Sequence, residues 1–326
     1  MNKTYLSFIV VLLLIPLTVI YAATTGSIEV TVLELIKGLF VNADDNVAII
    51  KDLRFPRIII SLFAGATLAV SGVLLQAVMR NPLAEPGIIG VSSGAGFVTI
   101  LMVTFFPTLY FYTPLFAFIG GALAFFLVFT FSWKSGLNPL RMILIGVAIN
   151  AVFVGLSELF TSGGTSVVNA VSVTTSTLSM KTWNDVNIIG IYGSIGLILS
   201  IIFYRYANHL GLRDQTLKSL GFRVNLARLI LSIIAVLLAS IATAIAGMFT
   251  FVGLLIPHIG RSLVGTNHKV LIPFSALAGA LLILIADTLG RIILAPMEIP
   301  ASIIMAIIGG PFLIFLLRKS DRIYGN

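Results

Sequence analysis

The residue types that carry out chemistry in proteins are scarce in this chain, and they are not grouped as an active site requires. Its 326 residues include no cysteine, so there is neither a thiol nucleophile nor a cysteine-ligated metal site. The three histidines, His209, His258 and His268, have no ligand partners at metal-binding spacing. No Gly-Lys dipeptide occurs, so the phosphate-binding loop of P-loop NTPases is absent. We therefore expect no catalytic residue, metal site or cofactor in this chain.

The elements that must position the remaining polar residues are membrane-spanning helices. The chain is 58% apolar and 10% charged, with a mean hydropathy of +1.11, whereas a soluble domain is about 45–50% apolar and about 25% charged. It therefore lacks the polar residues to cover a water-facing globule. The net charge of +8 reflects Lys and Arg gathered on one side of a bilayer. We expect an all-α polytopic membrane protein and no nucleic-acid partner.

Nine apolar stretches are long enough to cross about 30 Å of hydrocarbon. They are residues 6–23, 58–79, 88–106, 111–133, 142–160, 188–204, 229–260, 270–286 and 299–317. The stretch 229–260 has 32 residues with no Asp, Glu, Lys or Arg, and one straight helix of that length would measure about 48 Å. Because Gly247, Gly253 and Pro257 lie inside it, we expect a break near 247–253 and a return. That gives about ten spans in a single membrane domain, residues 1–326.

The distribution of basic residues supports ten spans over nine. With the N-terminus in the cytoplasm, ten spans put 14 of the 20 Lys and Arg residues inside, whereas nine spans divide them equally. The positive-inside rule therefore predicts ten helices with both termini cytoplasmic. The alternative for the first span is a cleaved signal peptide, with Lys3 before it and Ala22-Ala23 after it. Its 18 apolar residues exceed the usual h-region of about 7–15 residues, so we expect a retained helix.

Ionisable side chains are almost absent from the predicted spans. Glu158 and Asp287 lie near span ends, and Gln76 and Asn150 are polar but uncharged. Carriers driven by protons or sodium normally place carboxylates or histidines near the midplane, where each has a high energetic cost. An ion-coupled secondary carrier is therefore a less favoured alternative. A structural membrane subunit without a pathway is a second one.

Three Pro- and Gly-rich motifs interrupt the apolar stretches. The first is residues 80–87, Arg-Asn-Pro-Leu-Ala-Glu-Pro-Gly, whose two prolines predict a cytoplasmic turn. The second is residues 246–261, which ends in Pro-His-Ile-Gly-Arg. The third runs from the Ala-Asp pair at 286–287 through Glu-Ile-Pro at 298–300 to Gly-Gly-Pro at 309–311. Each motif taken alone is typical of a turn or a packing face.

Together, in this order and spacing, the motifs resemble those of the FecCD-type permeases, the membrane subunits of iron-siderophore, haem and cobalamin ABC importers. Residues 53–57, Leu-Arg-Phe-Pro-Arg, are similar to the family's arginine-proline-arginine signature before the second helix. The resemblance covers roughly residues 50–320. It implies a type II importer permease fold of ten helices in the bacterial cytoplasmic membrane. The implied partners are a second permease subunit (a copy or a paralogue), two cytoplasmic ATPase subunits that bind the ATP, and an extracytoplasmic substrate-binding lipoprotein.

The resemblance also implies roles for two sets of polar residues on the inner side. Residues 207–228 look like the segment that couples the permease to its ATPase, and Leu220-Gly221 predicts a helix end with a left-handed cap. The candidate contacts are Lys218, Ser219, Leu220, Gly221, Phe222 and Arg223. Family members commonly carry Ala at the position of Leu217. The alternative is a solvated basic loop that only fixes topology. The motif residues expected near the pathway are Gln76, Asn81, Pro82, Glu85, Pro86, Pro257 and His258.

On the outer side, the resemblance implies that Arg54, Arg57 and Arg291 pair with acidic residues of the binding protein. Arginine binds carboxylates in a bidentate fashion, and complementary charge steers docking. The alternative is that these arginines snorkel at the interface or pair within the chain. The candidate partners within the chain are the neighbouring acidic residues of the motifs, Asp52, Asp287 and Glu298.

The substrate is the least defined part of the interpretation. The segments 177–186 and 298–301 are most similar to the haem permeases of Gram-positive surface iron-acquisition systems. A ferric siderophore is the next alternative, followed by cobalamin. A wide pathway for such rigid molecules needs a weakly binding wall, and the lack of charge in the spans agrees with that requirement.

Overall fold

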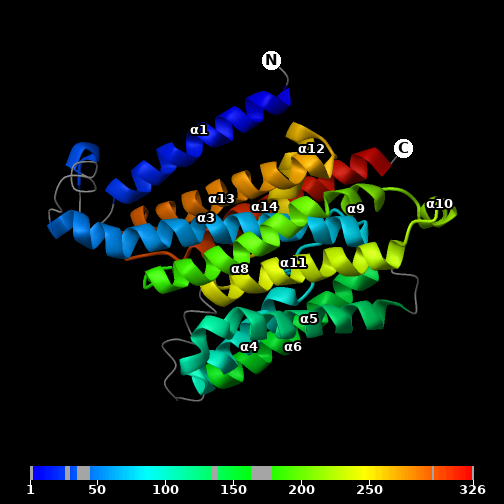
Figure 1. Cartoon of the computed structure of the whole chain (residues 1–326), viewed down its shortest axis with the longest axis horizontal. Coiled ribbons are helices and arrows are strands. Elements are labelled where there is room, and N and C mark those ends of the chain that lie inside the picture. The colour runs from blue at the N-terminus through cyan, green and yellow to red at the C-terminus, as the bar shows by residue number, and fades with distance from the viewer. Residues whose placement is uncertain are drawn as a thin grey trace.

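The computed structural model describes residues 3–25, 30–34, 45–133, 139–162, 178–295 and 297–324, and every element assigned within them is a helix (Figure 1). The elements are α1 Lys3–Thr24, α3 Asp45–Met79, α4 Val91–Phe105, η1 Pro107–Tyr112, α5 Thr113–Trp133, α6 Pro139–Ser162, α8 Trp183–Ile202, α9 Tyr204–His209, α10 Asp214–Ser219, α11 Val224–Ala246, α12 Val252–Val264, α13 His268–Ile292 and α14 Ala301–Tyr324.

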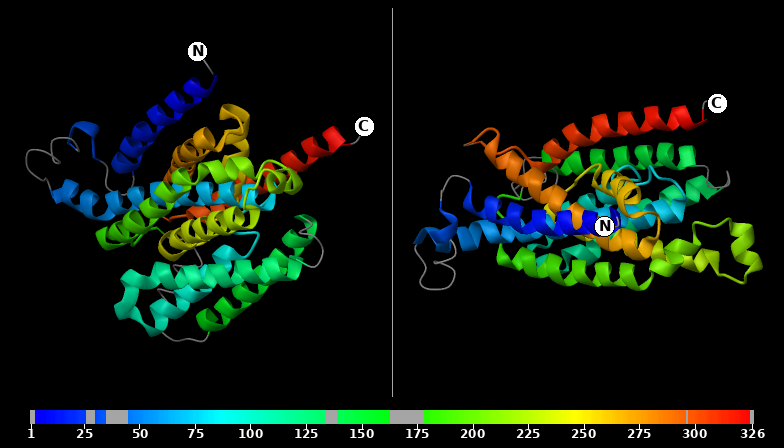
Figure 2. Two further views of the ribbon diagram at one scale, coloured as in Figure 1. Left: turned by 45° about the vertical axis from the view of Figure 1, so that its right-hand side comes forward. Right: turned by 90° about the horizontal axis from the view of Figure 1, so that it is seen from above.

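The helices form two groups that meet at α11. Helices α4, α5 and α6 pack on one another, and α3 packs against α8, α11, α12 and α13. Helix α11 contacts both α4 and α5 in the first group and α3 and α8 in the second. Figure 2 shows the first group below the rest of the bundle in its left view, with α1 at the opposite edge.

Among the described residues, seven helices are long and apolar enough to cross a membrane, and α4, α12 and the 301–315 part of α14 are shorter apolar helices. The expected stretches therefore all correspond to helices. The second one differs at its start, because α3 begins at Asp45 rather than near residue 58. Arg54 and Arg57 consequently lie within α3 and not before it. Hydropathy marks the apolar part of a helix, whereas the helix itself continues into polar sequence.

The expected break in the stretch 229–260 is confirmed. Helix α11 ends at Ala246, followed by Gly247 with φ of 90°, and α12 begins after Phe251, which has φ of 69°. The return is also confirmed by contacts. At the start of the stretch, Arg228 of α11 and Arg80, the residue after α3, both contact Asp214. At its end, Arg261 in the last turn of α12 donates a hydrogen bond to Gln76, which lies in α3 one turn before Arg80. Both ends of this stretch therefore lie at one end of the bundle.

Close backbone contacts explain why α3 can occupy the centre. A Cβ on Gly65 would lie 2.0 Å from the carbonyl oxygen of Gly279 in α13, and one on Gly72 would lie 2.0 Å from that of Gly253 in α12. Only glycine permits these distances, and small residues at such crossings let membrane helices approach closely. The bundle is thus fixed by contacts that tolerate no side chain.

Candidate docking, coupling and pathway sites

The end of the bundle that carries Arg57 is built around one buried ion network. The Arg57 Nε lies 2.9 Å from Asp287 Oδ2, and its Nη1 lies 2.9 Å from Glu298 Oε2. Its Nη2 also donates to Asp287 Oδ1 at 2.9 Å. Arg57 is 7% exposed and Asp287 is 1% exposed. The guanidinium of Arg57 is therefore bound bidentately by two carboxylates of its own chain, which is the pairing that the sequence offers as an alternative to docking.

Arg54 and Arg291 lie beside this network and hold the end of α1. Arg54 Nη1 donates to the Ala23 carbonyl at 2.7 Å, and Arg291 Nη2 donates to the Ala22 carbonyl at 2.9 Å. Both arginines are at most 9% exposed. The structure thus brings together the three arginines that the sequence predicts for docking, and it places them under the surface rather than on it.

Glu298 is the exposed edge of the network. Its side chain is 40% exposed, and its Oε2 accepts a hydrogen bond from Ser179 Oγ at 2.7 Å as well as the Arg57 donor. Burial acts to raise the pKa of Glu298, but the Ser179 hydrogen bond and the positive charge of Arg57 outweigh it, so that the pKa lies below its ordinary value. Glu298 is therefore charged at neutral pH and joins α3 to the segment between α13 and α14.

A second polar cluster joins the end of α3 to the start of α12. Gln76 Nε2 donates to the Gly253 carbonyl at 3.0 Å, while Arg261 donates to Gln76 Oε1. Glu85, in the turn between α3 and α4, accepts from the Phe251 backbone N–H at 3.1 Å. A carboxylate at this position is favourable because the helix dipole is positive at its N-terminus. Burial nevertheless raises the pKa of Glu85 to about 7, although the N–H groups of Phe251 and Leu254 act to lower it.

The rest of the turn shows which predicted pathway residues lie together. The Asn81 side chain accepts from the Leu83 N–H at 3.0 Å and is buried, and the Pro86 carbonyl accepts from the N–H of Val91 at the start of α4. Pro82 alone among the predicted residues of this turn is exposed. Gln76, Glu85 and Pro86 thus meet α12, whereas Asn81 and Pro82 shape the turn.

The remaining predicted pathway residues lie within α12. Pro257 is buried inside the helix. The ring of His258 packs edge-on against Phe312 of α14, with ring centroids 5.9 Å apart. These contacts join α12 to α14, and through Gln76 and Glu85 they join both helices to α3.

The predicted coupling segment contains a short helix with the expected cap. Helix α10 ends at Ser219, and Gly221 has φ of 73°. The Phe222 N–H donates to the Leu217 carbonyl at 2.9 Å and the Gly221 N–H to the Lys218 carbonyl at 3.0 Å. This is the Schellman pattern, so the left-handed cap predicted from Leu220-Gly221 is confirmed.

The segment presents a largely polar surface on which Leu220, at its tip, is the most exposed of three exposed leucines, the others being Leu212 and Leu226. Leu220 is 72% exposed, while the Phe222 ring packs on Tyr206 and His209 of α9. Leu217 is buried and contributes to the core, so a change between Leu and Ala at this position alters packing rather than the exposed face. The other exposed candidates are Lys218, Ser219, Gly221 and Arg223.

Asp214 anchors this segment to the bundle, and the sequence motifs did not single it out for that role. Its carboxylate lies 2.6 Å from Arg80 Nη2 and 3.1 Å from Arg228 Nη2. The Arg80 Nε also donates to the Leu210 carbonyl at 2.8 Å. One signal was present in the sequence: Asp214 is the only acidic residue between Asp185 and Asp287.

These features define a multi-helix membrane protein with a small polar segment at one end and a buried ion network at the other. The model of the FecCD transport family matches residues 12–319, and the chain belongs to this family. It is a multi-pass protein of the cytoplasmic membrane and a transport permease.

Relatives and solved structures are similar to this chain over most or nearly all of its length. It is 43% identical over 321 residues to the "Probable heme-iron transport system permease protein IsdF" of Staphylococcus aureus strains MSSA476 and Newman, covering 98% of each chain. A solved metal-chelate type ABC transporter in an inward-facing conformation has a TM-score of 0.80 and 28% identity, covering 97% of this chain and 99% of that one. A PsaBC complex of Streptococcus pneumoniae, 16% identical with a TM-score of 0.63 and covering 87% and 95%, shares the fold.

Proposed function

We propose that this chain is the membrane-spanning subunit of an ATP-binding cassette importer that carries an iron complex, with haem as the first candidate substrate. The observation that carries this proposal is the 43% identity to IsdF over 98% of both chains. A ferric siderophore is the second candidate and cobalamin the third. ATP is bound by a partner subunit, because the chain has no P-loop sequence.

The proposed topology has ten spans and cytoplasmic termini. The seven long and three short apolar helices support it. So does the Lys3 Nζ, which donates to the Ser262 carbonyl in α12 and thereby places the start of α1 near the Arg80 end of the bundle. In this topology the Arg80 end is cytoplasmic and the Arg57 end faces outward. The hydrogen bonds from Arg54 and Arg291 to the last turn of α1 favour a retained first helix.

The proposed assembly contains two permease subunits, two ATPases and one lipid-anchored binding protein. The second permease is a copy of this chain or a paralogue. The ATPase binds the exposed residues of the coupling segment, 218–223, with Leu220 as its apolar anchor. The pair of ionic contacts at Asp214 then carries ATPase movement to α3 and α11. Coupling of this kind requires an element with two discrete positions that both the ATPase and the membrane helices can bias.

The binding protein docks at the Arg57 end in this proposal. Arg57 already binds two carboxylates of its own chain. The three arginines therefore attract the binding protein mainly through the positive electrostatic field of the network and by positioning Glu298, and less through direct hydrogen bonds from their guanidinium groups. Long-range charge affects the association rate more than it affects affinity. Arg54→Glu is expected to slow association of the binding protein. Unchanged association in an assembled complex would remove the docking proposal.

The decisive experiment reconstitutes the permease with its ATPase and binding protein in proteoliposomes. ATP hydrolysis and uptake are measured with the binding protein empty or loaded with haem, a ferric siderophore or cobalamin. We expect stimulation and uptake with haem. Stimulation only by a siderophore or cobalamin would change the substrate and retain the importer. Uptake by the chain alone, driven by a proton or sodium gradient, would replace the importer by a secondary carrier. A complex that assembles but transports nothing would favour a structural subunit.

A further inference from the structure

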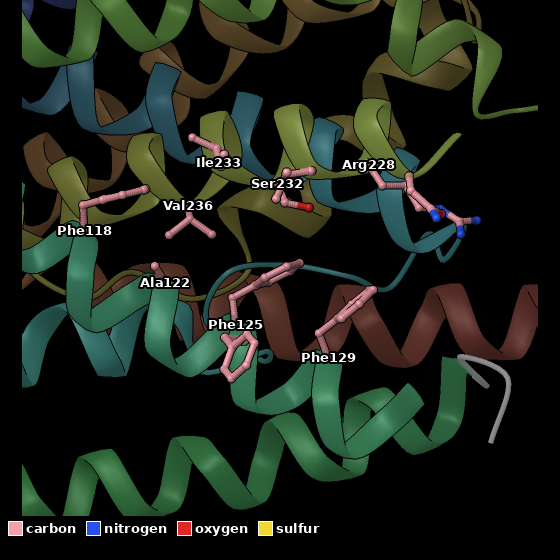
Figure 3. A pocket seen from close by; sticks show the side chains of 11 residues that line it. Phe118, Ala122, Phe125, Phe129, Arg228, Ser232, Ile233 and Val236 are labelled. Carbon is pink, nitrogen blue, oxygen red and sulfur yellow. The ribbon is translucent and has the colours of Figure 1, made fainter. Parts of the chain in front are cut away.

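A half-open groove runs between α5 and α11, where the two groups of helices meet (Figure 3). Its volume is about 430 Å³. Phenylalanines of α5 form one wall and aliphatic residues of α11 form the other. The lining residues that matter below are Phe118, Ala122, Phe125, Phe129, Arg228 and Ser232. The walls are apolar along most of their length, and the polar side chains gather at the Arg228 end.

Arg228 lies at this polar end, and only part of its guanidinium group is hydrogen-bonded. Its Nη2 contacts Asp214 at 3.1 Å, yet its Nε is buried with no hydrogen-bond partner among the described residues. Asn225, one turn earlier on α11, also lines the groove. A buried N–H without a partner destabilises the folded protein. The polar end of the groove therefore carries one guanidinium N–H that the described part of the chain leaves without a partner, beside the polar side chain of Asn225.

We propose that the groove binds one anionic phospholipid, with an acyl chain along the phenylalanine wall and the phosphate on Arg228 and Asn225. An apolar channel with a cationic end has the polarity of a lipid molecule. The α5 wall from Phe118 to Phe129 rises about 16 Å, close to half of a hydrocarbon core of about 30 Å. The proposal rests on the proposed function only in placing Arg228 at the cytoplasmic leaflet, where anionic lipids attract basic residues.

A flexible acyl chain fits this groove better than a further helix does. Helices α5 and α11 pack directly against each other, so a further helix, roughly 10–12 Å across with its side chains, could not enter between them without separating them. Leu229 and Ile233 at the groove are about half exposed, so the groove is open to the surrounding bilayer. An entering lipid chain need not displace any described element.

The site is connected to the coupling segment through a single guanidinium group. While Arg228 Nη2 holds Asp214 at the start of α10, the same guanidinium group lines the polar end of the groove, where the phosphate would lie. A bound lipid would fix Arg228 in the position that also orients α10. Anionic lipid is therefore expected to increase transport per ATP hydrolysed.

The test uses the intact importer complex in nanodiscs that contain equal amounts of phosphatidylglycerol and phosphatidylcholine. Lipids retained after mild extraction are counted by native mass spectrometry. We expect phosphatidylglycerol to be retained about fivefold over phosphatidylcholine, since one basic residue near the surface contributes about that factor. Arg228→Gln should abolish the preference, and Ala122→Phe should reduce retention of both lipids by filling the groove. Arg205→Gln is the matched control, because Arg205 is an exposed arginine of α9 at the same end that neither lines the groove nor belongs to the coupling segment.

Each outcome decides the proposal without reference to the transported substrate. Equal retention of both lipids by the unchanged complex would overturn it, as would the same loss of preference in Arg205→Gln as in Arg228→Gln. A second permease copy cross-linked to Phe126 within the groove would assign the groove to a protein interface and also overturn it. Should Arg228→Gln fail to assemble, Ala122→Phe still tests the site because it leaves the contact between Arg228 and Asp214 intact.

Discussion

The two ends of the bundle use arginine in opposite ways. At the Arg57 end, one guanidinium is bound by two carboxylates, and the pair of Arg57 and Asp287 is almost fully buried. At the Arg80 end, one carboxylate is shared by two arginines, and Asp214 and Arg80 are about one-third exposed. Buried ion networks are costly to break, whereas exposed pairs contribute little to stability. The first arrangement is suited to holding helices in place, and the second to transmitting movement.

The two neighbourhoods also differ in how they are connected. The Arg57 network joins α1, α3 and α13 with the segment before α14. Asp214 instead joins a six-residue helix to the rest of the protein through a few polar contacts. A short helix held in this way can be moved by a partner at small energetic cost. The comparison therefore predicts stability effects at one end and coupling effects at the other.

The largest expected effect is the loss of Arg57. Arg57→Ala leaves Asp287 buried without its main partner, and breaking a buried pair in this way costs about 3–5 kcal/mol. We expect a strongly reduced yield and a large fall in the thermal unfolding temperature of the purified permease. Lys51→Ala, which removes an exposed basic residue six positions earlier, should leave both unchanged. A stable Arg57→Ala protein would contradict the assignment of this network as the structural end.

The next effect is expected at Asp214 and concerns coupling rather than stability. Asp214→Asn removes the charge that both Arg80 and Arg228 contact. Because these groups are partly exposed, the stability change should stay below about 1 kcal/mol. We expect a several-fold fall in substrate transported per ATP hydrolysed, with ATP hydrolysis largely kept. Gln215→Ala, exposed on the same helix, is the control, and an equal loss of coupling there would show that any change in α10 has this effect.

A smaller effect is expected at the cap of α10. Gly221 has φ of 73°, and a Cβ there would meet no atom within 4 Å, so Gly221→Ala changes the backbone energy alone. The left-handed conformation costs an alanine about 1 kcal/mol. We expect a few-fold weaker binding of the ATPase, measured by titration in detergent. Gly190→Ala in α8, which is equally uncrowded and has no positive φ, should have no such effect.

Local features of this molecule were predictable, and pairings between distant residues were not. The break at Gly247–Phe251 follows from glycines in an overlong apolar stretch, and the α10 cap follows from Leu220-Gly221, because both depend on backbone conformation within a few residues. The partners of Arg57 lie 230 and 241 positions away. Their acidic character made Asp287 and Glu298 candidate partners of Arg57. Only the packing of α3 on α13 shows that Arg57 pairs with them and not with acidic residues of a binding protein.

The helix ends were less predictable for a related reason. The start of α3 at Asp45 lies in polar sequence that hydropathy assigns to a loop. The contact of Gln76 with Gly253 and Arg261 depends on the absence of a side chain at Gly72, which lets α12 approach α3. The sequence motifs placed Gln76 and Glu85 among the residues expected near the pathway, whereas their common role at the start of α12 required the three-dimensional arrangement.

The smallest expected effect is a pH dependence at Glu85, in the turn from α3 to α4. Burial raises its pKa from 4.5 to about 7, so the folded protein keeps this proton to a higher pH than the unfolded chain does. Linkage then requires the stabilising contribution of protonated Glu85 to be complete below about pH 4.5 and to be lost as the pH rises through 7. The unfolding temperature of the permease should consequently decline from about pH 5 to about pH 7 and level off above that.

Glu85→Gln separates this contribution from all others that depend on pH. Glutamine retains an acceptor for the Phe251 N–H and has no proton to lose, so its unfolding temperature should fall less over the same interval. Both proteins are compared in one detergent at constant ionic strength, by intrinsic fluorescence. Identical pH profiles would mean that Glu85 does not titrate in this range and that the α12 N-terminus holds its carboxylate charged. The turn would then belong with the Arg57 network as a fixed part of the bundle.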